Sequence, residues 1–365
     1  MILQEVINYL EELAPPSYQE SYDNAGLIIG DASCEFTKAI ICLDSTEEVV
    51  EEAIAKGANI IIAHHPIVFS GLKKLNGSNY VERTVIKAIK HDIAIYAIHT
   101  NLDNVVDGVN KKIADKLGLE QLEILSPKKD LLNKLIAFVP LKDKSKVLNA
   151  MFNAGAGQIG NYSESSFSSV GEGTFKGNEE SKPVIGTSNK LERVQEEKIE
   201  VLVENHRLTI VIQALLTAHP YEEVAYDVIA LKNTNHQIGS GMFGVLPNPV
   251  SPHEFFRILQ EKFVVPVVRH TPIVGDKIQG VALCGGAGSF LLPAAVRKNA
   301  DVFVTGDFKY HEFFDADNQL IIADIGHYES EQYTSEFLIE KLTKKFRNFA
   351  FLLTEKNTNP VNYFI

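Results

Sequence analysis

The segment Ile60-Ile61-Ile62-Ala63-His64-His65-Pro66 (residues 60–66) decides how this chain folds. A short apolar run such as residues 60–63 is typical of a buried strand in a parallel sheet. Pro66 lacks an N–H group and favours an extended residue before it, so the strand must end there. Sites of open α/β sheets lie at the carboxyl ends of strands, and neighbouring strand residues point to opposite faces. We therefore predict that His64 and His65 bind two different metal ions.

Two neighbouring segments repeat the pattern of a buried strand followed by polar side chains. Residues 39–44 form a predicted strand that ends in Asp44, and residues 93–98 form another that leads into His99 and Asp103. Because the carboxyl ends of parallel strands share one edge of a sheet, we expect Asp103 to supply the first carboxylate ligand. His99 is predicted to orient a ligand or a substrate. Asp44 either supports a histidine or forms a turn.

The second half of the chain echoes the first. Residues 55–62 (AKGANIII) are mirrored by residues 297–304 (RKNADVFV), and the strand before Asp103 is mirrored by residues 320–325. We therefore predict an α/β fold in which two related α/β halves face each other and bring their strand ends into one cleft. These halves form one discontinuous domain.

The segment 324–331 (DIGHYESE) supplies the partners for that cleft, at the start of a helix predicted to run to about Leu342. His327 and Glu331 are four residues apart and so share a helix face. Together with His64, His65 and Asp103 they make five nitrogen and oxygen ligands, which suit two ions that share a bridging carboxylate. Without a cysteine ligand, zinc, manganese and iron(II) all remain open, with zinc placed first. The predicted metal ligands are His64, His65, Asp103, His327 and Glu331, and the predicted supporting or acid–base groups are His99, Asp307 and His311.

The middle of the chain has a different pattern of secondary-structure elements. Strands and helices alternate there as two β-α-β passages in roughly 100 residues, which predicts a ferredoxin-like α+β insert. The predicted domains are residues 1–129, the first half of a metal-binding α/β domain, residues 130–236, the insert, and residues 237–365, the second half.

Three polar or glycine-rich stretches receive weaker assignments. Asp23 and Asn24 are interpreted as turn formers. The run 218–223 (AHPYEE) is interpreted as a helix-to-strand turn with satisfied polar groups. Residues 285–289 (GGAGS) resemble a phosphate cradle before a helix, but they lack the lysine and the spacing of the known phosphate-binding fingerprints.

The length, net charge and cysteine content of the chain exclude several classes of protein. A chain of 365 residues is too long for one typical core, so two domains are expected. The net charge of −12 argues against a surface built for nucleic-acid phosphates. Three widely spaced cysteines make neither a disulfide framework nor a zinc ribbon. No signal peptide and no membrane-spanning run is evident, so we expect a cytoplasmic protein that does not contact membranes.

Four motifs, in order, resemble those of the Nif-three-like dinuclear-metal family, whose members carry the name GTP cyclohydrolase I type 2. They are AHHPIVF (63–69), IHTNLD (98–103), TGDFKYH (305–311) and DIGHYESE (324–331). Carried over by position, the family's metal ligands fall on the same five residues, with Glu331 as the bridge. The stretches SSFSSVGEGTFKG (165–177) and AHPYEEVAYDVIAL (218–231) resemble the PII/CutA-like insert of the family's longer members. The resemblance also implies a toroidal homohexamer with two divalent metal ions per chain.

The same resemblance implies a metal-dependent hydrolase that opens the guanine ring of GTP. Two metals suit phosphoester hydrolysis equally well, so a phosphatase or nuclease is the enzymatic alternative. Because the insert resembles small-molecule sensor domains, a metal- or nucleotide-responsive binding module is the alternative from a different class.

Overall fold

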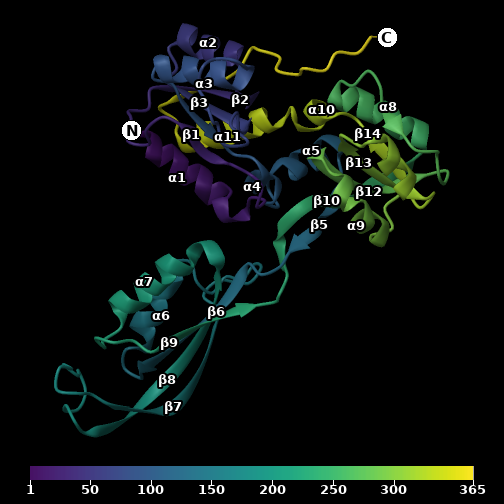
Figure 1. Cartoon of the computed structure of the whole chain (residues 1–365). Helices are drawn as coiled ribbons and strands as arrows, with labels where there is room; N and C mark the ends of the chain where they lie inside the picture. The colour runs from purple at the N-terminus through teal and green to yellow at the C-terminus, as the bar shows by residue number, and fades with distance from the viewer. Residues whose placement is uncertain (365) are drawn as a thin grey trace. The chain divides into compact units, whose positions relative to one another are not determined.

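The structure is a computed structural model that describes residues 1–364. The chain divides into two compact units, which are shown in Figure 1 and treated one at a time. Unit 1 contains Met1–Pro127 and His236–Ile365, and unit 2 contains Lys128–Asn235. None of the helices within residues 1–364 combines the length and the apolar character that crossing a bilayer would need.

Unit 1 is built on two sheets, of which the first has five strands in the order β1-β4-β3-β2-β15. The strands β4, β3, β2 and β15 are parallel, and β1 is antiparallel to β4. The central strand β3 is buried from Ile60 to His64, as its apolar sequence predicts. The strands are β1 (Gly26–Ile29), β2 (Lys38–Asp44), β3 (Ile60–His65), β4 (Ala94–Ala97) and β15 (Ala350–Leu353).

The second sheet has six strands in the order β11-β14-β13-β12-β10-β5. Its parallel core β14-β13-β12 repeats β4-β3-β2 of the first sheet, and β11 is antiparallel to β14 as β1 is to β4. The prediction of two related α/β halves is therefore confirmed. The strands are β5 (Glu120–Lys128), β10 (Asn235–Val250), β11 (Arg269–His270), β12 (Ile278–Ala287), β13 (Val302–Gly306) and β14 (Ile321–Asp324).

The helices of unit 1 begin and end where the sequence supplies caps. In α2, Thr46 accepts a hydrogen bond from the Val49 N–H, and Gly57 ends the helix in the left-handed conformation. Helix α2 thus returns the chain to β3. The helices are α1 (Leu3–Leu13), α2 (Glu47–Lys56), α3 (Tyr80–Lys90), α4 (Thr100–Asp103), α5 (Val109–Leu117), α8 (Pro252–Phe263), α9 (Leu292–Arg297), α10 (His327–Glu331) and α11 (Thr334–Lys345), with 3₁₀ turns η1 (Pro16–Tyr18), η3 (Ser289–Leu291) and η4 (Tyr310–Ala316).

The prediction of one helix from His327 to about Leu342 is wrong, because the chain breaks between α10 and α11. The Gln332 side chain donates to the Glu329 carbonyl at 3.0 Å and to the Phe263 carbonyl at 2.9 Å. In a continuous helix the Glu329 carbonyl would accept from the N–H of residue 333. The amide of Gln332 replaces that bond, and α10 ends as a short helix that carries both candidate ligands.

Unit 2 is a four-stranded antiparallel sheet in the order β7-β8-β6-β9. Its apolar core lies between the sheet and the helices, where Leu135 of β6 and Ile199 of β8 pack with Leu215 of α7. Residues 166–176 form a long strand despite their serines and glycines. The elements are β6 (Leu132–Pro140), α6 (Lys144–Asn153), β7 (Ser166–Lys176), β8 (Leu191–Glu204), η2 (Asn205–Arg207), α7 (Leu208–Ala218) and β9 (Tyr226–Leu231).

Candidate metal centre

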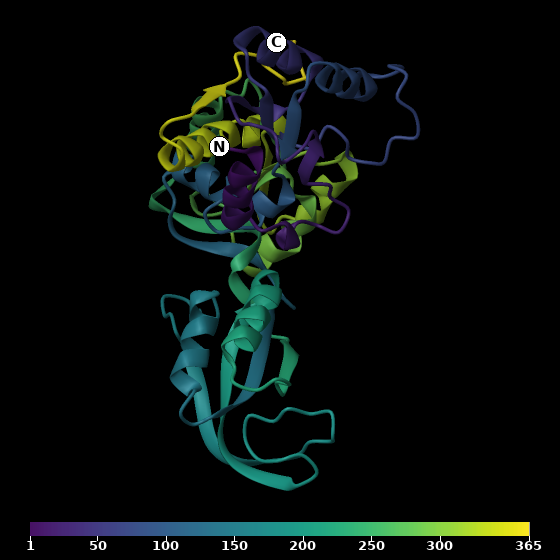
Figure 2. The same cartoon turned by 90° about the vertical axis from the view of Figure 1, so that its left-hand side faces the viewer.

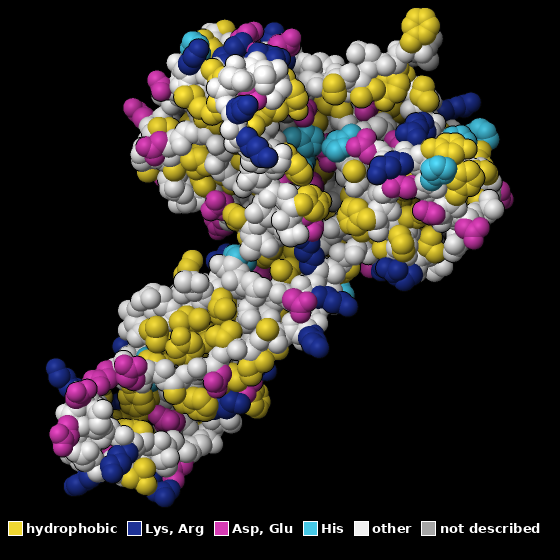
Figure 3. All heavy atoms as spheres, viewed as in Figure 1, with side chains coloured by type: hydrophobic (Ala, Val, Ile, Leu, Met, Phe, Trp, Pro, Cys, Tyr) yellow, Lys and Arg dark blue, Asp and Glu magenta, His cyan; other side chains and the backbone are white. Residues whose placement is uncertain are grey.

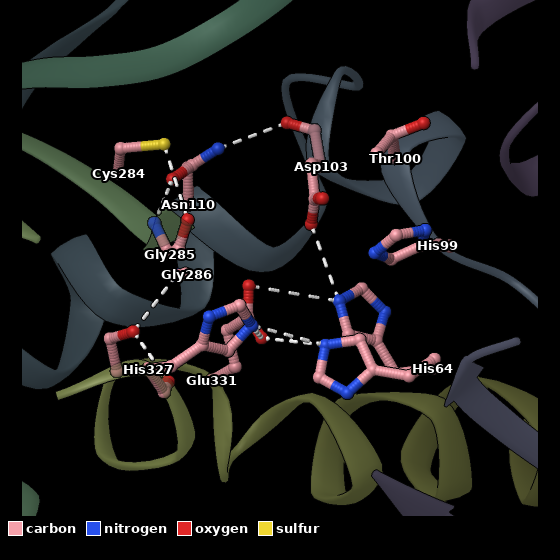
Figure 4. A network of polar contacts seen from close by, with 12 residues as sticks. His64, His99, Thr100, Asp103, Asn110, Cys284, Gly285, Gly286, His327 and Glu331 are labelled. Atoms are coloured by element: carbon pink, nitrogen blue, oxygen red, sulfur yellow. Dashed lines mark hydrogen bonds and ion pairs between the residues drawn. The ribbon is translucent and has the colours of Figure 1, made fainter. Parts of the chain in front are cut away.

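Five histidine and carboxylate side chains from the two halves of unit 1 meet at the carboxyl ends of their strands (Figure 4). His64 and His65 end β3, and Asp103 ends the short helix α4 that follows β4. His327 and Glu331 lie one turn apart on α10, which follows β14. The structure thus brings together all five residues predicted as metal ligands.

Glu331 lies at the centre of this cluster and is almost fully buried. Its Oε2 is 3.0 Å from His65 Nε2 and 3.1 Å from His327 Nε2. Its other oxygen, Oε1, is 3.9 Å from His64 Nε2, which is 3.6 Å from Asp103 Oδ1. The two oxygens of one carboxylate therefore face two different groups, His65 with His327 and His64 with Asp103.

The separations in both groups fit a metal site, and one group also contains polar atoms without partners. His64 Nε2 and Asp103 Oδ1 are buried and have no hydrogen-bond partner among the described residues. Ligands about 2.1 Å from a tetrahedral ion lie roughly 3.4 Å from one another, which is close to the separations in both groups. An orphaned buried nitrogen and oxygen are costly in an apolar interior, and a cation between them would remove that cost.

The other ring nitrogen of each histidine is held by an oxygen, which leaves Nε2 directed into the cluster. His64 Nδ1 donates to the Ile98 carbonyl at 2.8 Å. His65 Nδ1 is 2.8 Å from Asp44 Oδ1, and His327 Nδ1 is 2.7 Å from Asp307 Oδ2. Such contacts orient histidine ligands in metal sites. Of the two roles open to Asp44, the structure thus favours support of a histidine.

Asp44 is itself held by a residue far away in the sequence. The Thr358 hydroxyl donates to Asp44 Oδ2 at 2.7 Å. The segment after β15 therefore contributes to the support of His65.

A second histidine–aspartate pair lies beside the cluster. His99 Nδ1 is 2.7 Å from Asp23 Oδ1, and the Asp23 carboxylate also accepts hydrogen bonds from the Thr100 N–H and hydroxyl. The His99 ring lies 5.3 Å from that of His65 and 5.4 Å from that of His64. The interpretation of Asp23 as a turn former was incomplete, because its side chain is fully buried against His99.

Burial and crowding of charge shift the pKa values of the cluster. Burial, and then the charge of Glu331, raise the pKa of Asp103 to about 7. Burial lowers the pKa of His65, but Asp44 and Glu331 outweigh it and raise this pKa to about 10. Asp307 and Glu331 likewise overcome burial and raise the pKa of His327 to about 11. The cluster thus concentrates negative charge that attracts cations.

Two glycines let Glu331 approach the second sheet. A Cβ atom on Gly286, whose φ is +63°, would lie 2.4 Å from Glu331 Oε1. The N–H groups of Gly285 and Gly286 donate to Asn110 Oδ1 and Ser330 Oγ at 3.0 and 2.9 Å. The weak resemblance of residues 285–289 to a phosphate cradle is therefore not supported at the first two positions, because the amides of Gly285 and Gly286 are occupied and both residues belong to β12.

A cavity of about 1020 Å³ opens onto the cluster, and its lining comes from both halves of unit 1. In the space-filling view, histidine and acidic side chains meet at the surface of this unit (Figure 3). Two exposed aromatic rings, Tyr22 and Phe69, line the cavity with their centroids 6.2 Å apart. The Phe69 ring also lies 6.3 Å from that of His99.

His311 does not join the cluster. It lies exposed on η4, where its ring contacts those of Tyr310 and Phe314, and it does not line the cavity. The predicted supporting role of His311 is therefore not available in this structure, whereas His99 and Asp307 both lie beside predicted ligands.

The fold and the cluster together define an α/β protein with a candidate divalent-metal centre. The chain belongs to the Duf34/NIF3 (NGG1p interacting factor 3) family, whose model matches residues 1–360. The family resemblance predicted from the motifs is thereby confirmed.

Relatives match over nearly the whole chain. A Halalkalibacterium halodurans protein named GTP cyclohydrolase 1 type 2 homolog is 41% identical over 347 residues, which cover 94% of this chain and 93% of that protein. A Bacillus subtilis protein of the same name is 39% identical, over 99% of this chain and 98% of that one. A solved Bacillus cereus protein related to NIF3 superposes with a TM-score of 0.87 and 38% identity, and covers 100% of this chain and 99% of its own.

Proposed function

We propose that this protein is a hydrolase that binds two divalent metal ions and acts on a purine nucleotide, with GTP as the first candidate. The observation that carries the proposal is the position of Glu331, whose two buried oxygens face separate ligand groups. The proposed ligands of one ion are His64, Asp103 and Glu331, and those of the other are His65, His327 and Glu331. Zinc is the first candidate, followed by manganese and iron(II).

Divalent ions in these sites would lower the pKa of water and stabilise negative charge on an attacked centre. The chain's own residues then have defined tasks. Asp44, Asp307 and the Ile98 carbonyl hold the three imidazoles through Nδ1, so that each Nε2 stays directed at the centre. Because this support is preformed, little reorganisation is needed when a substrate enters.

His99 is the residue best placed to move a proton. Asp23 fixes its Nδ1, and its ring lies against those of His64 and His65. Its Nε2 is thus available to accept a proton from water and to return it to a leaving group.

The cavity supports a substrate with a planar base. Its volume of about 1020 Å³ exceeds what one nucleotide needs, and the exposed rings of Tyr22 and Phe69 offer stacking surfaces beside the cluster. The names of the relatives point to GTP. A phosphoesterase would use the same ions, and a binding module would use the cavity without turnover.

The test uses metal-free protein reloaded with zinc, manganese or iron(II) and supplied with GTP. The proposal predicts formate and a ring-opened product. Inorganic phosphate without formate would instead indicate a phosphoesterase, and tight nucleotide binding without any product would indicate a binding module.

Two histidine variants make this test specific. His327→Ala removes a proposed ligand and should lower turnover at least about a hundredfold, because a displaced ligand disturbs the reacting geometry. His311→Ala makes the same change on an exposed histidine away from the cavity and should leave turnover unchanged. Equal activity of the two variants would contradict the assigned site.

We also propose the toroidal homohexamer on the strength of the family resemblance. Light scattering should then give a mass of about six chains of 40.4 kDa each, and a monomeric mass would contradict it.

A further inference from the structure

A second cavity lies wholly within unit 2, on the sheet face that α6 and α7 leave uncovered. Its volume is about 630 Å³, within the usual range for small-molecule sites. The floor is formed by β7 and β8, and the walls are residues 181–185, from the loop after β7, and residues 221–225, before β9. The Lys182 N–H donates to Glu222 Oε1, which ties the two walls together. Figure 2 shows the loop folded back beside the two strands.

The register of the sheet explains why this face is hollow. Ile199, Val201 and Val203 of β8 are buried against the helices, so the alternate residues of β8 point to the uncovered face. On β7 that face is formed by Ser169, Gly171 and Gly173, which pair with Lys198, Glu196 and Val194. Small side chains thus leave room in the middle of the sheet.

The carboxylate of Glu196 occupies part of this room. A Cβ atom on Gly173 would lie 2.1 Å from Glu196 Oε2, so the carboxylate lies directly over that glycine. Among residues 1–364, Glu196 forms no ion pair with a lysine or an arginine, whereas Lys198 beside it is paired with Glu200 at 2.7 Å. A carboxylate without a counter-ion in a partly apolar cavity favours a cationic ligand.

Three aromatic rings line the same cavity as this carboxylate. Phe138 and Phe175 line the cavity from β6 and β7, and the Tyr221 ring lies 6.1 Å from that of Phe175. The Tyr221 hydroxyl is buried and has no hydrogen bond of good geometry among the described residues. Burial, then the close side-chain contact with Glu196, and then the charge of that carboxylate raise the pKa of this hydroxyl. The hydroxyl therefore lies beside the Glu196 carboxylate, which has no lysine or arginine partner among the described residues.

His219, which lies in the run 218–223 predicted to form a turn, holds Tyr221 in place. His219 Nε2 donates to the Phe138 carbonyl at 3.0 Å, and its Nδ1 accepts from the Tyr221 N–H at 3.1 Å. With both ring nitrogens occupied, His219 has no free atom for a ligand. Its role is to fix Tyr221 against the cavity.

We propose that this cavity binds a small organic amine, whose ammonium group contacts Glu196 and whose apolar or aromatic body lies among Phe138, Phe175 and Tyr221. Ammonium groups are favoured both by carboxylates and by the faces of aromatic rings. None of the residues that line this cavity is a proposed metal ligand. Amine binding can therefore be tested independently of the proposed hydrolase activity.

The test measures tryptamine binding to the full-length protein by fluorescence anisotropy. The chain contains no tryptophan, so indole emission reports the probe alone. Tryptophol and indole-3-propionate carry the same ring with a neutral and an anionic end. We expect tryptamine to bind at least about tenfold more tightly than either.

Variants on the two faces of β8 locate the site. Glu196→Gln removes the charge and keeps the shape, and should weaken tryptamine binding about tenfold. Glu197→Gln is the matched control, because Glu197 lies on the covered face and pairs with Lys144. Phe175→Leu keeps apolar volume but removes a ring face, and should weaken binding severalfold.

Selective tryptamine binding that is lost in Glu196→Gln and kept in Glu197→Gln supports the proposal. Absence of tryptamine binding, equal affinity for the three indoles, or no loss in both Glu196→Gln and Phe175→Leu would overturn it.

Discussion

Replacement of Gly286 by alanine should disrupt the proposed metal centre without replacing any of its ligands. The new Cβ would lie 2.4 Å from Glu331 Oε1 and 3.2 Å from His327 Cε1. Since nonbonded carbon and oxygen atoms separate by more than 3 Å, the carboxylate has to move by about 1 Å. The φ of +63° at Gly286 adds backbone strain of about 1–2 kcal/mol for any residue with a side chain.

Gly118→Ala is the matched control for this substitution. Gly118 has nearly the same φ, +69°, but a Cβ there would meet nothing within 4 Å. Both variants should lose about 1–2 kcal/mol of unfolding free energy through backbone strain in the metal-free protein, and Gly286→Ala should lose more because its Cβ also displaces Glu331. Only Gly286→Ala should also lose metal affinity, by about ten- to a hundredfold, as expected when the support of a ligand is disturbed.

The assay is a zinc titration against a chromophoric chelator, combined with denaturant unfolding of each metal-free variant. If Gly286→Ala binds zinc with wild-type affinity, the position of Glu331 does not determine metal binding and the assigned role of this carboxylate is wrong. Equal loss of affinity in Gly118→Ala would trace the effect to general destabilisation.

Three further predictions concern protons, acid stability and the insert. With pKa values of about 10 and 11, His65 and His327 are protonated at pH 7 in the metal-free protein. Metal binding should therefore release protons and become tighter as pH rises. Calorimetric binding heats that are the same in buffers of different ionisation enthalpy would contradict this prediction. Burial raises the pKa of Asp23, but hydrogen bonds from His99 and Thr100 outweigh it and lower this pKa from 3.8 to about 2. The stabilisation of about 2 kcal/mol is therefore complete above pH 4 and lost as pH falls through 2, so denaturant unfolding between pH 5 and 2 should show a shallower loss in Asp23→Asn than in the wild type, and parallel curves would refute it. We propose that residues 130–236 fold as an independent insert, so a short Gly/Ser linker in their place should keep the metal stoichiometry; a folded deletion protein that binds no metal would show that the insert helps to build the site.

The ligand cluster was predictable because sheet geometry translates sequence into position. A buried run that stops at a proline fixes where His64 and His65 lie, and the internal echo indicates that a second set of strand ends faces them. The spacing of His327 and Glu331 needs only the helical period. These inferences depend on local sequence and on topology, which one sequence contains.

The supporting residues were not predictable in the same way. Asp23 looks like any turn residue, because its partner His99 lies 76 positions away and nothing local indicates the contact. Gly286 looks like part of a phosphate loop, whereas its lack of a side chain serves the approach of Glu331. His311 shares a motif with Asp307, but the 3₁₀ turn η4 leaves it on the surface. Such roles are set by tertiary contacts between distant segments.

We propose that one buried carboxylate, that of Glu331, is shared by two metal sites. Elemental analysis of fully loaded, freshly desalted protein tests it most directly, with Glu331→Gln prepared in parallel. We expect two zinc ions per wild-type chain and fewer than one in Glu331→Gln, because the substitution disturbs both sites at once. At most one ion per wild-type chain, or a Glu331→Gln protein that keeps two, would contradict it.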